Sequence, residues 1–309
     1  MTKYIIFSDL DGTLLDHFTY SFGAASDALK LIRAKGIPLI ICTSKTRAEI
    51  LPIRKKLKNR DPFISENGGA IYMPDKYFNF TYEFRKRVNG YRVIEIGIPH
   101  EALLHVLREI RDETGTEIAN ISDMSIGKIM DFTCLKKRDA ELSKKREYSE
   151  PFLIYPHTYS RRLPMPIRCG STPVGIGVGV NERRWINRVK KEILKKGFEF
   201  TFGGRFFHIM KGNDKGKAVK ILKKLYERKY GKMTTIGIGN SANDLPMLKA
   251  VDIPVLVKNY DGRHEKNIKL ENLYLADEIG PEGWSDFIIK LLATDSHRLK
   301  KTEDKKIRG

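Results

Sequence analysis

A short apolar stretch that ends in two aspartates opens the chain, and this junction constrains the fold more than any other feature. Tyr4–Ser8 carries no charge and is rich in β-branched and aromatic side chains, which is typical of a buried strand in a parallel sheet. Asp9 and Asp11 follow directly, and Gly12 allows the chain to turn. Because ligands of open α/β sheets bind beyond the carboxyl ends of the strands, we expect both carboxylates to face a crevice.

Two adjacent carboxylates repel each other unless a cation or a proton lies between them. At an effective dielectric constant of ~20, two unit charges ~4 Å apart repel by ~4 kcal/mol. Mg²⁺ is a hard cation that prefers oxygen ligands, so it would relieve this repulsion. A solvated turn is the ordinary interpretation of an isolated Asp-x-Asp pair, but the preceding strand and the following Gly12-Thr13 favour a magnesium site.

The pattern of elements predicts an α/β protein with an insertion. A chain of 309 residues can form one large domain or two modest ones. Residues 1–82 and 203–294 predict a Rossmann-like parallel-sheet core, and residues 83–202 predict an inserted α+β cap domain with a strand near Lys128–Cys134. Residues 295–309 are polar and basic, and we expect a disordered tail there.

The formal net charge of +19 is compatible with a nucleic acid, an anionic membrane or a small anionic substrate. Because the excess of lysine and arginine is spread over many predicted helices without interleaved aromatic residues, solvated helix faces explain it best, and no nucleic-acid partner is expected. No run of eighteen apolar residues and no secretory leader pattern occurs, so no membrane association is expected and the predicted location is cytoplasmic. The oligomeric state stays open.

Three further strand ends or helix starts carry polar groups. Thr43–Thr46 follows a second apolar strand and opens a helix, where hydroxyls and backbone amides can bind an anion or simply cap the helix. Lys215 stands at the start of another helix. Asn240–Asp244 follows the apolar strand Thr234–Gly239. With the Asp9/Asp11 pair, these segments predict one polar edge of the sheet.

In this order, the four segments resemble the four motifs of the haloacid dehalogenase-like phosphohydrolases. The resemblance implies that Asp9 is a nucleophile that forms an aspartyl-phosphate, and that Asp11 is the general acid and then the general base. It also implies that Thr43 and Lys215 hold the phosphoryl oxygens. The magnesium ligands that it implies are Asp9, Asp11, Asn240 and Asp244.

One position departs from the pattern of the family. The fourth motif usually begins Gly-Asp, whereas this chain has Gly239-Asn240. A carboxamide oxygen can still bind Mg²⁺, but the site loses one negative charge. We therefore expect metal binding to be weaker than usual unless Asp244 compensates.

Within the family, residues 42–49, 66–72, 146–152, 203–208 and 214–218 resemble the mannosyl-3-phosphoglycerate phosphatase branch. This resemblance implies a substrate with a phosphate, a carboxylate and sugar hydroxyls. Arginine and lysine are suited to its anionic groups. The substrate-binding residues predicted on this basis are Ser44, Lys45, Arg47, Asn67, Gly68, Ser149, Glu150, Arg205 and His208.

Three alternatives stay open at the level of the sequence. Glucosyl-3-phosphoglycerate or another sugar phosphate would suit the same chemistry. Asn240 also allows a non-catalytic, ligand-binding relative of these phosphatases. A nucleic-acid binder attracted by the positive charge is the least favoured, because the charge is distributed.

Overall fold

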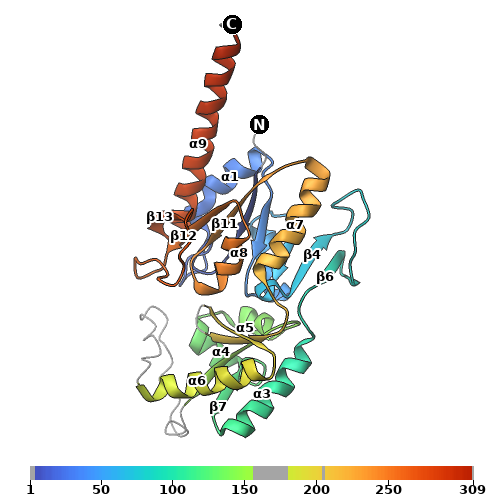
Figure 1. Cartoon of the computed structure of the whole chain (residues 1–309), viewed down its shortest axis with the longest axis vertical. Helices are drawn as coiled ribbons and strands as arrows, with labels where there is room; N and C mark the ends of the chain where they lie inside the picture. The colour runs from blue at the N-terminus through green and yellow to red at the C-terminus, as the bar shows by residue number, and fades with distance from the viewer. Residues whose placement is uncertain (1–3, 156–179, 204–205, 308–309) are drawn as a thin grey trace.

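The structure is a computed structural model that describes residues 4–155, 180–203 and 206–307. Within these residues the strands form a nine-stranded sheet and a separate four-stranded sheet, which lie one beyond the other along the long axis of the molecule (Figure 1). This architecture confirms the predicted α/β fold, with a Rossmann-like core and an α+β cap.

The large sheet has the strand order β13-β12-β11-β1-β2-β3-β4-β6-β5. The strands from β13 to β3 run parallel, and β4, β6 and β5 extend the sheet by antiparallel pairing. The strand bounds are β1 (Tyr4–Ser8), β2 (Leu39–Cys42), β3 (Phe63–Ser65), β4 (Ala70–Pro74), β5 (Lys86–Val88), β6 (Tyr91–Glu95), β11 (Thr234–Gly239), β12 (Ile253–Lys258) and β13 (Tyr274–Ile279).

Alternate side chains of the central strands belong to two separate apolar layers. Ile6 of β1 packs with side chains of α1 and α9, whereas Ile5 and Phe7 pack with side chains of α7 and α8. This period of two is the alternation expected for a strand buried on both faces. The helices that accompany the large sheet are α1 (Ser26–Ala34), α2 (Arg47–Lys56), α7 (Lys215–Tyr230), α8 (Leu245–Lys249) and α9 (Gly280–Ile307), with short 3₁₀ turns η1 (Gly23–Ala25), η2 (Glu66–Gly68) and η4 (Ala242–Asp244).

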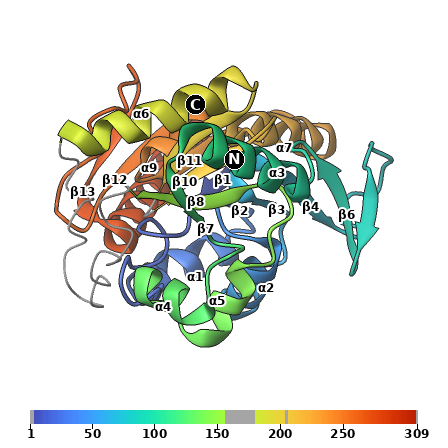
Figure 2. The same cartoon turned by 90° about the horizontal axis from the view of Figure 1, so that it is seen from below.

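The small sheet is antiparallel, in the order β7-β8-β10-β9. Its elements are β7 (Glu117–Asn120), β8 (Glu150–Tyr155), β9 (Glu199–Gly203), β10 (Phe206–Met210), α3 (His100–Thr114), α4 (Ile126–Thr133), α5 (Lys137–Ser143) and α6 (Val180–Lys195). One apolar cluster joins the sheet to α3 and α6, and another joins it to α4. Seen from below, this cap covers one end of the large sheet, and the β5–β6 hairpin projects beside it (Figure 2).

Sheet membership differs from the boundaries expected for the insertion. β5 and β6 fall in the range expected for the cap, yet β6 pairs with β4 of the large sheet. β10 falls in the range expected for the core, yet it pairs with β8 and β9 of the small sheet. The alternation of a strand shows that one face is buried but does not identify the partner strand. We propose a division into core and cap with crossings near residues 96 and 211, where Ile98 N donates to Lys211 O at 3.2 Å.

The prediction of a strand near Lys128–Cys134 is wrong, because these residues belong mostly to α4. The side chain of Ser125 caps this helix by accepting a hydrogen bond from Lys128 N at 3.3 Å. Ile129 is buried on one side of the helix. A run of seven residues with apolar members suits either element, and here the cap and tertiary packing decided for the helix.

In the structure α9 continues through most of the predicted tail to Ile307, and disorder of the tail stays a prediction. Its first turns are anchored by the buried side chains of Trp284, Phe287 and Leu292. Extension from an anchored helix needs no new nucleation, and lysine, glutamate and leucine favour the helix. Figure 1 shows α9 projecting away from the cap. None of the described helices is long and apolar enough to cross a membrane.

Candidate active site

The carboxyl ends of three neighbouring parallel strands form the site. Ser8 of β1 pairs with Ile41 of β2 on one side and with Ile238 of β11 on the other, so the three strands end together. Asp9, Thr43 and Asn240 lie just beyond these ends. Gly12 completes the turn after β1.

The turn requires glycine for two reasons. Gly12 has a φ of +72°, and a Cβ atom there would lie 2.7 Å from Nδ2 of Asn240. Left-handed backbone and close approach are both unfavourable for other residues. The glycine thus lets the Asp9/Asp11 turn pack directly against the segment after β11.

A buried lysine links two of the strand-end motifs. Nζ of Lys215 lies 3.0 Å from Oδ1 of Asp9 and 2.7 Å from Oδ1 of Asp244, and only 1% of its side chain is exposed. The side chain of Asp214 caps α7 by accepting hydrogen bonds from Gly216 N and Lys217 N, which fixes Lys215 at the first position of the helix. The structure thereby brings Asp9, Lys215 and Asp244 into direct contact.

The charges of this group shift each other's ionisation. Burial raises the pKa of Asp9 to about 7, the charges of Asp244 and Asp11 add to the shift, and Lys215 opposes it. Burial by itself would lower the pKa of Lys215, but Asp244 and Asp9 outweigh it and the pKa is raised. The ionised form of Asp9 is therefore disfavoured in this environment, and a further cation beside the carboxylate would favour it.

Asp244 uses both carboxylate oxygens within the protein. Oδ1 binds Lys215, and Oδ2 accepts hydrogen bonds from Asn240 N at 3.0 Å and Ser241 N at 3.1 Å. Its side chain is completely buried. Asp244 thus positions Lys215 and the turn after β11.

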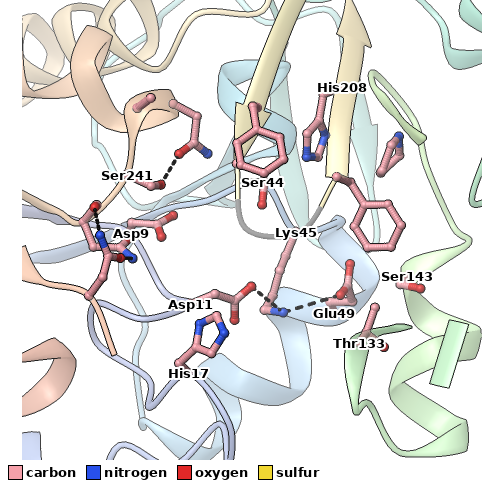
Figure 3. A pocket seen from close by; sticks show the side chains of 18 of the residues that line it. Asp9, Asp11, His17, Ser44, Lys45, Glu49, Thr133, Ser143, His208 and Ser241 are labelled. Atoms are coloured by element: carbon pink, nitrogen blue, oxygen red, sulfur yellow. Dashed lines mark hydrogen bonds and ion pairs between the residues drawn. The ribbon is translucent and has the colours of Figure 1, made fainter. Parts of the chain in front are cut away.

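A second ion pair holds Asp11. Nζ of Lys45 lies 2.9 Å from Oδ2 of Asp11 and 3.7 Å from Oε1 of Glu49 (Figure 3). Thr46 and Glu49 form a capping box at the start of α2, which places Glu49 beside Lys45. Burial would lower the pKa of Lys45, but Asp11 and Glu49 outweigh it and the pKa is raised. Lys45, predicted as a partner for the substrate, already pairs with two carboxylates.

A cavity of about 310 Å³ lies between this edge and the cap. Phe202 and Phe206 of the cap contribute apolar walls, and the acidic turn after β1 contributes polar groups. Figure 3 shows Asp9, Asp11, Lys45 and His208 around the same hollow. The predicted site residues that line the cavity are Asp9, Asp11, Ser44, Lys45, His208 and Asn240.

Comparisons with known proteins agree with this geometry. Residues 6–146 and 180–269 match the haloacid dehalogenase-like hydrolase family. The chain belongs to this family. A glucosyl-3-phosphoglycerate/mannosyl-3-phosphoglycerate phosphatase of Methanococcoides burtonii is 40% identical, with 96% of this chain and 99% of the relative covered. A mannosyl-3-phosphoglycerate phosphatase of Pyrococcus furiosus is 35% identical, with 84% and 93% covered.

Solved structures share the fold of this haloacid dehalogenase-like hydrolase. The sugar phosphatase BT4131, described as a member of subclass IIB of the HAD superfamily, matches with a TM-score of 0.59 at 19% identity. The match covers 94% of this chain and 99% of that structure. The structural match supports the fold, and the family model with the two phosphatase relatives confirms the family inferred from the four motifs.

Several predicted substrate residues lie outside the cavity and support the junction of core and cap. Arg47 Nε donates to Glu147 Oε1 at 2.9 Å. Ser149 Oγ donates to Glu66 Oε2 at 2.9 Å. Oε2 of Glu150 lies 2.5 Å from Nε2 of His100 within the cap. These side chains position the chain where it enters the cap.

Of the other four predicted residues, three do not line the cavity and one lies outside the residues that the structure describes. Asn67 Oδ1 accepts a hydrogen bond from Asn243 Nδ2 at 3.0 Å. Gly68 packs against the backbone at the start of α7. Thr43 is completely buried. Arg205 lies outside the described residues.

Sequence reasoning missed Arg146, Glu49 and Glu66 as parts of the site. Arg146 and Glu49 line the cavity. The carboxylate of Glu66 accepts hydrogen bonds from the backbone amides of residues 147, 148 and 149. The capping spacing Thr46-x-x-Glu49 was a usable signal, whereas nothing local in the sequence joins Glu66 to a segment eighty residues away.

The donor atoms at the cavity fit a hard cation such as Mg²⁺. Oδ1 of Asp11 is buried without a hydrogen-bond partner among the described residues. Asn240 Oδ1 accepts a hydrogen bond from Thr13 Oγ1 at 3.1 Å and keeps a second lone pair. The described residues contain no group of three Asp, Glu, His or Cys side chains placed to hold a metal. A cation here would thus depend on Asn240 and backbone oxygens as well as on the two aspartates.

Proposed function

We propose that this hydrolase is a Mg²⁺-dependent phosphatase of a sugar-linked 3-phosphoglycerate, which it converts to the sugar glycerate and phosphate. The buried contact of Lys215 with Asp244 and with Asp9, which lines the cavity between the core and the cap, carries the proposal. The names of the relatives support the substrate class. Mannosyl-3-phosphoglycerate is the first candidate, and glucosyl-3-phosphoglycerate is the close alternative because the Methanococcoides relative is named for both.

The proposed reaction has two steps. A carboxylate oxygen of Asp9 attacks phosphorus, the ester P–O bond breaks, and Asp11 donates a proton to the leaving oxygen of the sugar glycerate. Water then attacks the aspartyl-phosphate, Asp11 accepts its proton, and the P–O bond to Asp9 breaks to release phosphate. Both carboxylates return to their starting states.

Neighbouring groups stabilise the charge that moves during these steps. Lys215 compensates the charge of Asp9 and of the phosphoryl group, and Asp244 keeps it in place. The loop of Thr43 and Ser44 supplies hydroxyls and backbone amides for phosphoryl oxygens. Mg²⁺, when bound by Asp9, Asp11 and Asn240, would supply a positive charge that relieves the repulsion between Asp9 and the phosphate.

The cap would give the enzyme its selectivity. His208, Phe202 and Phe206 come from the cap and face the same cavity as Asp9. Closure over a small substrate would exclude water from the phosphoryl group, and opening could then limit turnover. A cytoplasmic location and the absence of a nucleic-acid partner stay predictions.

Phosphate release from a panel of phosphorylated metabolites, with and without Mg²⁺, tests the function. The panel includes both sugar phosphoglycerates and ordinary sugar phosphates. We expect the sugar phosphoglycerates to be hydrolysed best and only with the metal. Preference for a sugar phosphate without a carboxylate would overturn the substrate class.

Asp9→Asn tests the chemistry and excludes a purely binding role. We expect turnover to fall by at least roughly 10³-fold, because an amide cannot act as the nucleophile. Ligand binding, measured by calorimetry, should persist. Retained turnover would contradict the covalent mechanism, and a wild-type protein that binds the ligand without releasing phosphate would identify a non-catalytic relative.

A further inference from the structure

Arg146 is a buried cation at the boundary between core and cap. Its side chain is 7% exposed and lines the cavity. Nη1 donates to the carbonyl oxygen of Ser44 at 2.8 Å and to Oγ of Ser149 at 3.4 Å. Nε is buried and has no hydrogen-bond partner among the described residues. The Nε–H group of this guanidinium therefore makes no hydrogen bond within the described part of the chain.

The charge of Arg146 is also less compensated than that of the other cations nearby. Its closest carboxylate, Oε2 of Glu66, is 4.0 Å away. That carboxylate already accepts hydrogen bonds from Tyr148 N, Ser149 N and Ser149 Oγ. Lys45 and Lys215, in contrast, each have a carboxylate within 3.0 Å. A buried arginine in this position can stabilise an incoming anion.

His208 is a second buried group, and one of its ring nitrogens lacks a partner among the described residues. Its side chain points into the cavity from β10 (Figure 3), and it is 3% exposed. Nδ1 has no hydrogen-bond partner within the part of the chain that the structure describes. Burial lowers the pKa of His208 to about 3, and the charge of Arg146 adds to the shift, so the imidazole is neutral. A neutral ring carries one N–H, so Nδ1 donates to an anion in the tautomer that places the proton there, and in the other tautomer it accepts a hydrogen bond from a substrate hydroxyl.

The contact with Ser44 locates this pair relative to the phosphate. Ser44 follows Thr43 in the loop proposed to hold phosphoryl oxygens, and Arg146 donates to the Ser44 carbonyl. An anion on Arg146 would thus lie beside the phosphate and under the cap. In a 3-phosphoglycerate the carboxylate is only two carbon–carbon bonds from the phosphorylated carbon. The carboxylate and the phosphate of one substrate could therefore reach neighbouring groups such as Arg146 and the loop of Ser44.

We propose that Arg146 binds the substrate carboxylate and that His208 Nδ1 forms a hydrogen bond to the same end of the substrate. This assignment rests on the proposed function, and it deepens it by naming the residues that distinguish a phosphoglycerate from a neutral phosphomonoester. Arg146 touches the substrate but takes no part in proton or phosphoryl transfer.

Two small probes isolate the carboxylate: 3-phosphoglycerate and glycerol 3-phosphate have the same length, and a carboxylate in the first replaces a hydroxymethyl group in the second. Their dissociation constants are measured by calorimetry with Mg²⁺ in the full chain carrying Asp9→Asn, so that neither probe turns over. We expect 3-phosphoglycerate to bind roughly 10- to 100-fold more tightly, as a charge-assisted hydrogen bond allows.

Substitutions at Arg146 and His208 should reduce this ratio. Arg146→Gln should bring it to within about 3-fold of unity, and Arg146→Lys should restore part of it. His208→Phe, which keeps the ring and removes its nitrogens, should lower it roughly 3- to 10-fold. Arg47→Gln is the matched control: it removes one positive charge at the same boundary, but its arginine pairs with Glu147 outside the cavity, so the ratio should persist.

Three results would overturn the proposal: equal binding of the two probes by the parent, equal weakening of both by Arg146→Gln, or an equal loss of the ratio in Arg47→Gln. Phosphate release from mannosyl-3-phosphoglycerate by the wild-type enzyme separates this failure from failure of the proposed function. Release without an Arg146-dependent ratio rejects the subsite alone. An Arg146-dependent ratio without release rejects the function alone.

Discussion

At the scale of single residues, Asn240 and Lys215 show how a buried polar site limits each of its members. Both ends of the Asn240 carboxamide are engaged, since Oδ1 accepts from Thr13 and Nδ2 donates to Asn259 Oδ1 at 2.7 Å. Lys215 is enclosed by two carboxylates. A change in either residue therefore alters the charge balance of the whole site and not one contact alone.

Asn240→Asp should strengthen metal binding. The substitution keeps an acceptor for Thr13 and adds a negative charge beside Asp9, so the half-saturating Mg²⁺ concentration should fall roughly 3- to 10-fold. The measurement is phosphate release as a function of Mg²⁺ concentration, with Asn240→Ala as the control that should raise the value. An unchanged or higher value for the aspartate variant would count against Asn240 as a metal ligand.

Lys215→Met should destabilise the fold. It leaves Asp9 and Asp244 buried without a counter-charge, and removal of one member of a buried pair costs about 3–5 kcal/mol. Urea unfolding gives the free energy, and Lys223→Met is the control because the Lys223–Asp252 pair is partly exposed and contributes less than about 1 kcal/mol. Equal losses in the free energy of unfolding of the two variants would show that burial of the ion pair does not determine its contribution to stability.

At the scale of elements, the turn between β3 and β4 positions the start of α7. Gly68 has a φ of +91°, and a Cβ atom there would overlap the backbone of Asp214 and lie 2.5 Å from Lys215 N. The turn and the helix are far apart in the sequence and pack backbone to backbone. The position of Lys215 thus depends on the absence of a side chain in another element.

Gly68→Ala should therefore lower both stability and activity. We expect a loss of about 2–4 kcal/mol in the free energy of unfolding, from backbone strain and overlap together. Gly90→Ala is the matched control: its φ is +82°, but no atom lies within 4 Å of the added Cβ, so only the strain of about 1 kcal/mol applies. Urea unfolding gives the free energy of unfolding of both variants, and phosphate release gives their activity. Equal losses of stability in the two variants would contradict the role of close packing.

At the scale of the whole molecule, the residues proposed to contact the substrate come from both sheets, whereas the far end of α9 projects away from both (Figure 1). The loop after β2 reaches the cap through Thr46 Oγ1, which donates to Leu142 O at 3.1 Å, and through Arg146. The buried side chains that anchor α9 end at Leu292 within the described residues. We therefore propose that the catalytic unit is the core with the cap, and that the end of α9 is dispensable.

A chain truncated after residue 294 should keep its function. We expect the melting temperature to change by less than about 3 °C and phosphate release to change by less than about 2-fold, because the buried side chains that anchor α9 in the described part of the chain are all kept. Thermal unfolding and the phosphate assay measure both. A large loss of either would show that the end of α9 contributes to the core or to the site.

The sequence by itself determined the elements whose signals are local. Apolar runs ending in polar groups predicted β1, β2 and β11 with Asp9, Thr43 and Asn240 at their ends, and the order of the four motifs identified the family. The predicted start of a helix placed Lys215 at its head, and in the structure Lys215 is the first residue of α7. These features depend on neighbours in the chain, so they could be predicted without coordinates.

Only the tertiary structure decided which of these residues share a cavity. It joined Lys215 to Asp9 and Asp244, paired Lys45 with Asp11, and placed Arg47 outside the cavity with Glu147. It also decided that β5 and β6 belong to the large sheet and β10 to the small sheet, and it placed Arg146 beside Ser44. The reason is that a buried charge takes whichever opposite charge the packing brings within about 4 Å, and distance along the chain carries no information about that choice.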